Sequence, residues 1–345
     1  MSAETVIAID AMGGDNAPAA MIDGAAIAAM RFPGAKYIFF GDQPLVQSLL
    51  AKHAHLASRS VIRHTPDKIS SDMKPSQALR QGRNSSMRLA LDAVADGEAQ
   101  CAVSAGNTGA LMALAKFALK TLPNIDRPAL AGTIPTTRGQ SLMMDLGANI
   151  ECDSENLVQF ALMGAILART VLGIQKPSVG ILNVGSEEIK GHEEIRTALN
   201  ILRERPFPGH VHGFVEGNDL GAGTTDVIVT DGFSGNVALK TLEGTAKLIN
   251  HFLKSSLHAS LLNKVGAWLA KEAFMNVKRK LDPRHYNGAM LLGLQGLCVK
   301  SHGGTDAEGF ASAVALAIDL VQQNYIDHVR KELERHYGEA NGTAA

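Results

Sequence analysis

The feature that most constrains this chain is one order of segments that recurs along it. An apolar run rich in β-branched residues ends at a small or polar residue, a glycine-rich loop follows, and a stretch with helical spacing of apolar residues then begins. Clear instances start at residues 5–10, 99–104 and 178–183. Such alternation indicates a mainly parallel sheet with helices on both faces. A hairpin-length turn between the runs at 129–135 and 140–145 adds an antiparallel pair.

The same reading predicts the other elements and the limits of the domain. Further strands are expected at residues 36–40, 60–64, 210–216 and 226–230, and helices at 18–31, 43–53, 85–95, 154–171, 192–204 and 234–254, with one more ending near 119. With 345 residues, of which 46% are hydrophobic, the chain can bury a large core. We expect a three-layer αβα domain over residues 1–336, with a helical tip at about 254–285 within it, and a flexible tail at 337–345.

Composition excludes several classes of function. The formal net charge of −1 gives no overall attraction to nucleic acid. The three cysteines are far apart in the sequence, which argues against a disulfide framework or a cysteine-bound metal. Residues 1–10 lack the pattern of a signal peptide, and no apolar run reaches the length of a transmembrane helix. These features predict a cytoplasmic protein.

Polar residues follow the predicted strands at the points where each strand ends. They are Asp10, Ser104, Asp145, Asn183, Glu216 and Asp231. Glycines follow each of them within a few residues, so backbone N–H groups and the next helix N-terminus can approach an anion. Ligands of open α/β sheets bind beyond the carboxyl ends of the strands. The pattern favours an anion-binding crevice there, with ordinary turns as the alternative.

Three segments come close to a common nucleotide-binding or hydrolase motif, but none of them completes it. Residues 180–185 are followed by Ser186 and Glu187, so the lysine of a phosphate loop is missing. The glycines at 221 and 223 do not complete a dinucleotide fingerprint, and residues 232–235 are one residue short of a nucleophile elbow.

Seven segments instead match one family in order. They are DAMGGD at 10–15, SAGNTGA at 104–110, DLGAN at 145–149, NVGSEEIKG at 183–191, EGNDL at 216–220, TDGFSGNVALK at 230–240 and YNGA at 286–289. Over residues 4–330 the chain resembles the bacterial phosphate acyltransferase (PlsX) family of phospholipid synthesis.

The resemblance implies reversible transfer of a long-chain acyl group from acyl-[acyl-carrier-protein] to inorganic phosphate, with no cofactor. The acyl phosphate would serve a membrane-bound glycerol-3-phosphate acyltransferase. The resemblance also implies a Rossmann-like fold related to phosphotransacetylases and to isocitrate/isopropylmalate dehydrogenases, a homodimer, and peripheral association with the inner face of the cell membrane. The alternatives are a phosphotransacetylase acting on acyl-coenzyme A, a decarboxylating dehydrogenase, and a non-catalytic membrane-docking scaffold.

This reaction needs positioned hydrogen-bond donors more than a strong base. Phosphate is already anionic near neutral pH, so the protein must align it with the thioester and stabilise the oxyanion that forms. The candidates for catalysis are Lys190, Asn107, Asn183 and His302, with His302 as a proton donor to the leaving sulfur. The alternatives are non-catalytic roles, namely a solvated lysine, a helix cap and a structural histidine.

Other residues are candidates for holding the substrates. The phosphate contacts expected in the glycine-rich loops are Ser104, Thr108, Asn149, Ser186, Asn218, Asp231, Ser234 and Asn236. Lys74, Arg80 and Arg83 form a basic cluster that reaches either a phosphate or the phosphopantetheine phosphate, or else is simply a charged helix face.

The predicted tip combines apolar and basic residues at helical spacing. The apolar face has Leu257, Leu261, Leu262, Val265, Trp268 and Leu269, and the basic residues include Lys264, Lys271, Lys278, Arg279, Lys280 and Arg284. A cationic amphipathic helix with a tryptophan suits an anionic membrane surface. Dimer packing and contact with the acidic carrier protein are the other interpretations.

Overall fold

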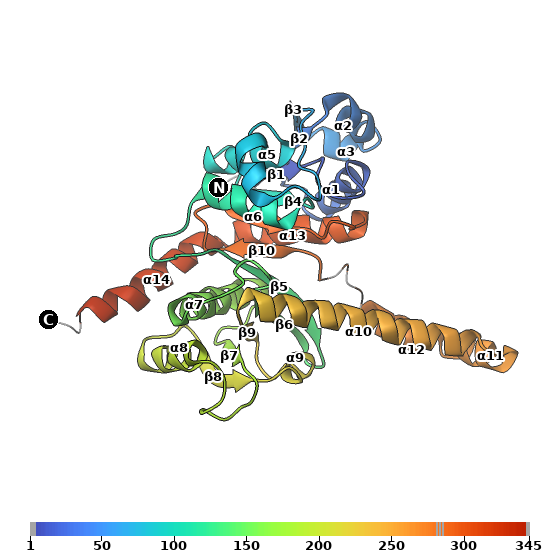
Figure 1. Cartoon of the computed structure of the whole chain (residues 1–345). Helices are drawn as coiled ribbons and strands as arrows, with labels where there is room; N and C mark the ends of the chain where they lie inside the picture. The colour runs from blue at the N-terminus through green and yellow to red at the C-terminus, as the bar shows by residue number, and fades with distance from the viewer. Residues whose placement is uncertain (1–4, 281, 283, 285, 343–345) are drawn as a thin grey trace.

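A computed structural model describes residues 5–280, 282, 284 and 286–342, apart from the side chains of Lys278 and of residues 339–342. Its centre is one sheet of 11 strands in the order β3-β2-β1-β4-β11-β10-β5-β6-β9-β7-β8 (Figure 1). The bounds in that order are Ser60–His64, Lys36–Gly41, Val6–Asp10, Cys101–Ser104, Leu297–Lys300, Ala289–Leu292, Ala129–Thr136, Gly139–Met144, Val227–Val229, Ser178–Leu182 and His210–Val215.

The sheet consists of two parallel halves with antiparallel strands between them. Strands β3, β2, β1, β4 and β11 are parallel to one another, and so are β6, β9, β7 and β8. Strand β10 runs antiparallel to both of its neighbours, and β5 and β6 form the predicted hairpin. The prediction of a mixed, mostly parallel sheet is confirmed.

Two apolar clusters cover the two faces of this sheet. Ile7 and Ile9 of β1 point to one cluster, with helices α1 (Ala19–Arg31), α7 (Ser154–Val171) and α13 (Ala307–Gln322). Ala8 points to the other cluster, with α5 (Ser86–Ala95) and α6 (Thr108–Leu119). Alternate residues of a strand face opposite sides, so the core has three layers.

The remaining helices complete these layers. They are α2 (Gln43–Leu50), α3 (Ala54–Ala57), α4 (Pro75–Gln81), α8 (Glu193–Glu204), α9 (Asp219–Ala222) and α14 (Tyr325–Gly342). Helix α14 continues past residue 336, where the sequence predicts a flexible tail. Buried His336 places its Nδ1 2.8 Å from the carbonyl of Pro206, and the Tyr337 hydroxyl donates to Glu155 at 2.6 Å.

Helices α10 (Gly232–His258), α11 (Leu261–Leu269) and α12 (Lys271–Lys280) extend away from the layered body (Figure 1). The Ser260 hydroxyl accepts the backbone N–H of Asn263 at 3.1 Å, so a new helix begins after a break. The apolar stripe predicted on one helix is therefore split between α10 and α11.

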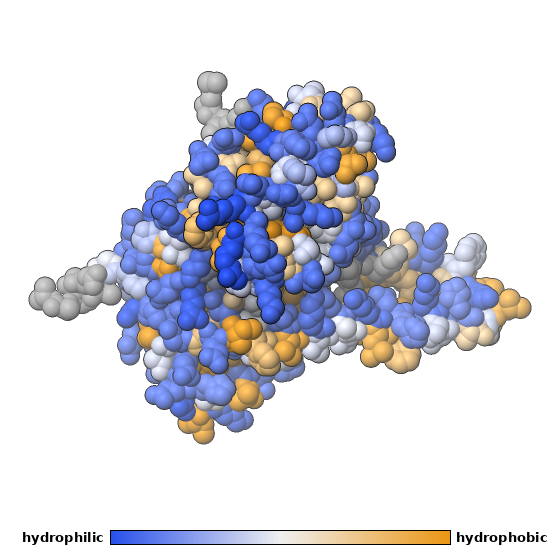
Figure 2. Space-filling model, turned by 45° about the horizontal axis from the view of Figure 1, so that its top comes forward, coloured by the Kyte–Doolittle hydropathy of each residue, from blue (hydrophilic) through white to orange (hydrophobic). Residues whose placement is uncertain are grey.

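Hydrophobic side chains are exposed along this projection, as the orange atoms of Figure 2 show. Trp268 and Leu269 are each 73% exposed, and Leu261 and Leu262 each 81%. Within the described ranges, none of the helices combines the length and the hydropathy needed to cross a membrane.

Candidate functional site

Three turns meet at one edge of the first half of the sheet. Strands β1, β4 and β11 are adjacent and parallel, so the residues that end them lie together. The buried carboxylate of Asp10 accepts the hydroxyls of Ser86 and Ser104, each at 2.6 Å, and Ser104 Oγ in turn accepts Gly106 N–H at 3.0 Å. Burial raises the pKa of Asp10, although these hydrogen bonds oppose the rise.

Lys300 ends β11 beside this carboxylate and is only 7% exposed. Its Nζ donates to the carbonyl of Ala105 at 3.5 Å and to the carbonyl of Ser301. Burial lowers the pKa of Lys300 to about 8, while Asp10 and Asp15 act in the opposite direction. At pH 7 this ammonium is mostly protonated, yet it can lose its proton near neutral pH.

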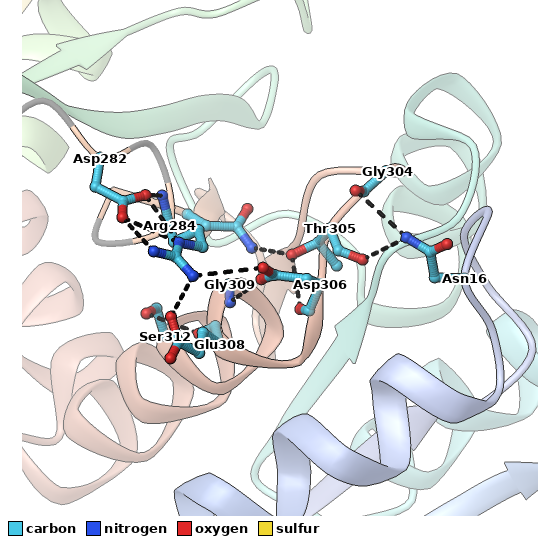
Figure 3. Close-up of polar contacts among 10 residues, drawn as sticks. Asn16, Asp282, Arg284, Gly304, Thr305, Asp306, Glu308, Gly309 and Ser312 are labelled. Carbon is cyan, nitrogen blue, oxygen red and sulfur yellow. Dashed lines mark hydrogen bonds and ion pairs between the residues drawn. The ribbon is translucent and has the colours of Figure 1, made fainter. Parts of the chain in front are cut away.

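The turn after Lys300 is held from two sides. Asn287 Oδ1 accepts His302 N–H at 2.9 Å, and its Nδ2 donates to the hydroxyls of Ser301 and Thr305. From the turn after β1, Asn16 Nδ2 donates to the carbonyl of Thr305 at 2.9 Å (Figure 3). Asn287 belongs to the YNGA motif, and Asn16 directly follows the DAMGGD motif. These two asparagines together hold the turn in place.

Arg284 attaches the segment leading from the projection to the same region (Figure 3). Its guanidinium pairs with Asp282 at 2.6 Å, with Asp306 at 3.6 Å and with Glu308, and the last two begin or precede α13. These neighbours raise the pKa of Arg284, so its charge is permanent. The basic residue predicted for the tip is thus an anchor near the site.

His302 is exposed in this turn, and its Nδ1 accepts Gly304 N–H at 3.2 Å. Loss of part of its solvent shell lowers the pKa of His302, and Lys240 and Lys300 lower it further. Lys240 belongs to α10, which starts in the second half of the sheet, so α10 brings positive charge toward the turn. At pH 7 the imidazole is mostly neutral, which suits proton acceptance better than donation.

A second group of turns follows β6 and β9. The Asp145 carboxylate, fully buried, accepts the backbone N–H groups of Leu130, Ala148 and Asn149, and the Asn149 side chain at 2.9 Å. Burial is the main cause that raises the pKa of Asp145. Asn149 also donates to the carbonyl of Pro128, so its side chain holds the turn.

The N-terminus of α10 packs closely against that turn. Asp231 caps the helix by accepting the Ser234 N–H at 2.8 Å and its hydroxyl at 2.9 Å, which occupies Ser234 Oγ. A Cβ on Gly235 would lie 1.9 Å from the backbone oxygen of Asp145, so no side chain fits there. Asn236 is exposed one residue further on.

We therefore expect Gly235→Ala to destabilise the fold strongly, by about 3 kcal/mol or more, because backbone must move to admit the methyl group. The matched change Gly244→Ala lies on the same helix with nothing within 4 Å of the new Cβ, and should be neutral or slightly stabilising. Urea unfolding of both variants checks this. Equal midpoints would contradict the packing described here.

The loop after β7 forms a third group, in which Lys190 is exposed. Lys190 Nζ pairs with Glu187 at 2.8 Å, and this neighbour raises the pKa of Lys190. Asn183 spans the loop, donating to the carbonyl of Lys190 at 3.1 Å and accepting Val184 N–H at 2.9 Å. Among the described residues, no hydrogen bond or ion pair joins this loop to Asp10, Lys300 or His302. Ser186 is exposed in the same loop, and Asn218 is exposed after β8.

Asn107 lies in the turn after β4, but its side chain contacts other segments. Its Oδ1 caps α6 by accepting Ala110 N–H at 3.0 Å, and its Nδ2 donates to the carbonyls of Ser71 and Met73. Every polar atom of its side chain is therefore engaged within the protein. Thr108 is exposed at the first turn of α6.

Lys74, Arg80 and Arg83 lie on and around α4, all exposed. Arg80 Nε donates to the carbonyl of Ser76 at 3.2 Å. None of the three is in hydrogen-bond contact with Asp10, Lys300 or His302 in the part of the chain that the structure describes.

Sequence comparison identifies the family. The model of the family described as "Fatty acid synthesis protein" matches residues 5–328. The chain belongs to this family. Relatives in it include a phosphate acyltransferase of Rhodospirillum centenum, 61% identical over 335 residues that cover 97% of this chain and 94% of that protein. Another, from Paramagnetospirillum magneticum, is 55% identical over 97% of this chain and 95% of its own length. The resemblance seen in the seven motifs is confirmed.

Solved structures of lower identity agree with the fold of the family. EutD phosphotransacetylase from Staphylococcus aureus superposes with a TM-score of 0.57 at 15% identity, covering 92% of this chain and 94% of that one. A 4-hydroxythreonine-4-phosphate dehydrogenase from Klebsiella pneumoniae gives 0.53 at 14% identity, covering 92% and 100%. These likenesses support the Rossmann-type α/β architecture.

Three residues near the site were not predicted from the sequence: Lys300, Lys240 and Ser86. In the sequence, Lys300 is simply the end of an apolar strand. Only the three-dimensional structure shows that it is buried in the electrostatic field of Asp10. One signal was available, since a lysine directly follows the buried run LCV and precedes the SHGG turn. Within the described residues, no group of three or more His, Cys, Asp or Glu is placed to hold a metal.

Proposed function

We propose that this chain transfers a fatty acyl group from acyl-[acyl-carrier-protein] to inorganic phosphate, giving an acyl phosphate for phospholipid synthesis. The observation that carries the proposal is the near full-length match to relatives named phosphate acyltransferase. In the reaction a phosphate oxygen attacks the thioester carbonyl carbon, a tetrahedral oxyanion forms, and the C–S bond breaks to release the carrier thiol. A C–O bond to phosphate replaces it.

We place the phosphate at the turns after β1, β4 and β11. Support comes from the buried ammonium of Lys300 and from the N-terminus of α6, both of which favour an anion. Lys300 is better suited than His302 to give a proton to the departing sulfur, because it is mostly protonated at pH 7. His302 is then a hydrogen-bond partner of phosphate or thioester.

The projection is proposed as the contact with other surfaces. Its exposed apolar residues on α10 and α11 and the exposed basic residues Lys264, Lys271 and Arg279 fit an anionic membrane surface or a second copy of the chain. We propose a homodimer that associates peripherally with the inner face of the cell membrane, close to a membrane-bound glycerol-3-phosphate acyltransferase. Each protomer is proposed as a single domain.

The test of this function is a direct assay of the product. Purified protein, palmitoyl-carrier protein and phosphate should give palmitoyl phosphate and one equivalent of free carrier thiol, without added metal. Acetyl-coenzyme A with phosphate tests the alternative of a phosphotransacetylase, whose relatives share the fold. Acetyl phosphate formed in preference to palmitoyl phosphate would overturn the proposal.

A further inference from the structure

Helices α4, α5 and α6 carry an excess of positive charge in a chain that is otherwise near neutral. Between Lys74 and Lys120 there are six Lys or Arg and three Asp or Glu, against a net charge of −1 for the whole chain. We define the α4–α6 surface by the residues Lys74, Arg80, Arg83, Arg88, Lys116, Phe117 and Lys120.

Two of the three acidic residues in this stretch are already paired. Asp92 pairs with Arg88 at 2.7 Å, and Glu98 with Arg63 at 3.4 Å. The other five basic residues of the α4–α6 surface are exposed, and across the described ranges none lies within 4.0 Å of a carboxylate. Unpaired cations on one face attract an acidic partner and speed its encounter.

A hollow with both apolar and charged lining lies within the same surface. It has a volume of about 480 Å³ and is lined by Leu79, Arg83, Arg88, Asp92 and Phe117. Phe117 is 64% exposed, with the Arg88 guanidinium 5.0 Å from its ring centroid. Exposed aromatic side chains next to arginines are typical of protein contact surfaces.

This surface leads to the proposed site. Helix α6 starts at Thr108, directly after the SAGNTG turn, and Phe117 is nine residues along it, roughly 14 Å away. The first turn of α4 lies beside that of α6, since a Cβ on Gly109 would be 3.0 Å from Pro75 Cγ. A protein seated on the hollow could send a long flexible arm along α6 to the turns.

We propose that the α4–α6 surface is where the acidic carrier protein docks, with an aliphatic or aromatic side chain of the carrier in the hollow beside Phe117. This inference rests on the proposed function. An anionic membrane is the weaker occupant because the surface is hollowed and lies on the body, away from the end of the projection at α11 (Figure 1).

The test is a double charge reversal, Arg80→Glu with Arg83→Glu. KM for palmitoyl-carrier protein should rise tenfold or more, and its dependence on salt should weaken. The rate with palmitoyl-pantetheine should stay within twofold of wild type, because that donor has neither the carrier protein nor the phosphopantetheine phosphate. The control is Lys176→Glu with Lys331→Glu, which makes the same charge change at exposed positions after α7 and on α14.

The outcomes distinguish failure of the proposed function from failure of the proposed docking surface. If wild-type protein makes no palmitoyl phosphate from either donor, the proposed function itself fails. If wild type is active and the Arg80/Arg83 double variant keeps its KM for the carrier donor, the docking surface is wrong. A rise in KM on Lys264→Glu with Lys271→Glu instead would assign docking to the projection. Loss of binding to phosphatidylglycerol vesicles with an unchanged KM would assign the surface to the membrane.

Discussion

Replacement of Lys300 by methionine should lower kcat/KM for acyl phosphate formation by about 10²–10³-fold. The buried ammonium donates to the carbonyl of Ala105, just after β4, and interacts electrostatically with Asp10 at the end of β1. Methionine keeps the length and apolar packing of the side chain but removes the charge and the donor. For the same reason the wild-type rate should fall as pH rises through about 8, where Lys300 loses its proton. The variant's residual rate should lack this step.

The same change should make the protein more stable at pH 7. A lysine whose pKa falls from 10.5 to about 8 on folding binds fewer protons when folded, so its burial opposes folding below pH 8. This penalty is fully present below pH 8 and disappears as pH rises to the unfolded pKa. Removing the charge should gain up to about 3 kcal/mol at pH 7 and nothing above pH 10.5.

Urea unfolding at pH 7 and pH-rate profiles measure the two effects together. Lys176→Met, at an exposed lysine, is the control and should change neither. An active variant, or one less stable at pH 7 than wild type, would show that Lys300 does not have this role.

Substitution of Gly13 by alanine should abolish most activity, by about 10²-fold, with a moderate loss of stability. A Cβ there would lie 2.3 Å from Asp10 Oδ2 and 2.8 Å from the backbone nitrogen of Gly106. The second contact is with backbone, so the turns after β1 and β4 must separate. A displacement of even 1 Å between reacting groups costs about 10²-fold in rate.

Gly34→Ala is the matched control, because nothing lies within 4 Å of its new Cβ. It should retain full activity. Steady-state kinetics and circular dichroism of both variants separate a displaced site from an unfolded protein. Wild-type kinetics for Gly13→Ala would mean that these turns are not part of the reacting centre.

The fold was largely predictable because its strongest signals are local. The strand at 60–64 and the helix at 154–171 match β3 and α7 residue for residue, and each has clear apolar patterning. Strands β10 and β11 were missed because they have four residues each and are buried, which removes the alternation that marks a strand. The break at Ser260 was missed because apolar spacing runs unchanged across it.

The site was predictable only in part, since its members come together through strand order. Ser104, from a family motif, and His302, from outside the seven motifs, both lie in the group with Lys300. Lys190 and Asn183 share the family motifs equally well, but β7 belongs to the other parallel half of the sheet. No local pattern reports which strands are neighbours, or that a lysine at a strand end is buried.

A crystal structure with orthophosphate bound tests the central claim most directly. We expect phosphate density within hydrogen-bond distance of Lys300 Nζ, between the turns at 12–15, 105–107 and 302–304. Phosphate bound instead beside Lys190, in the loop after β7, with none near Lys300, would contradict the account.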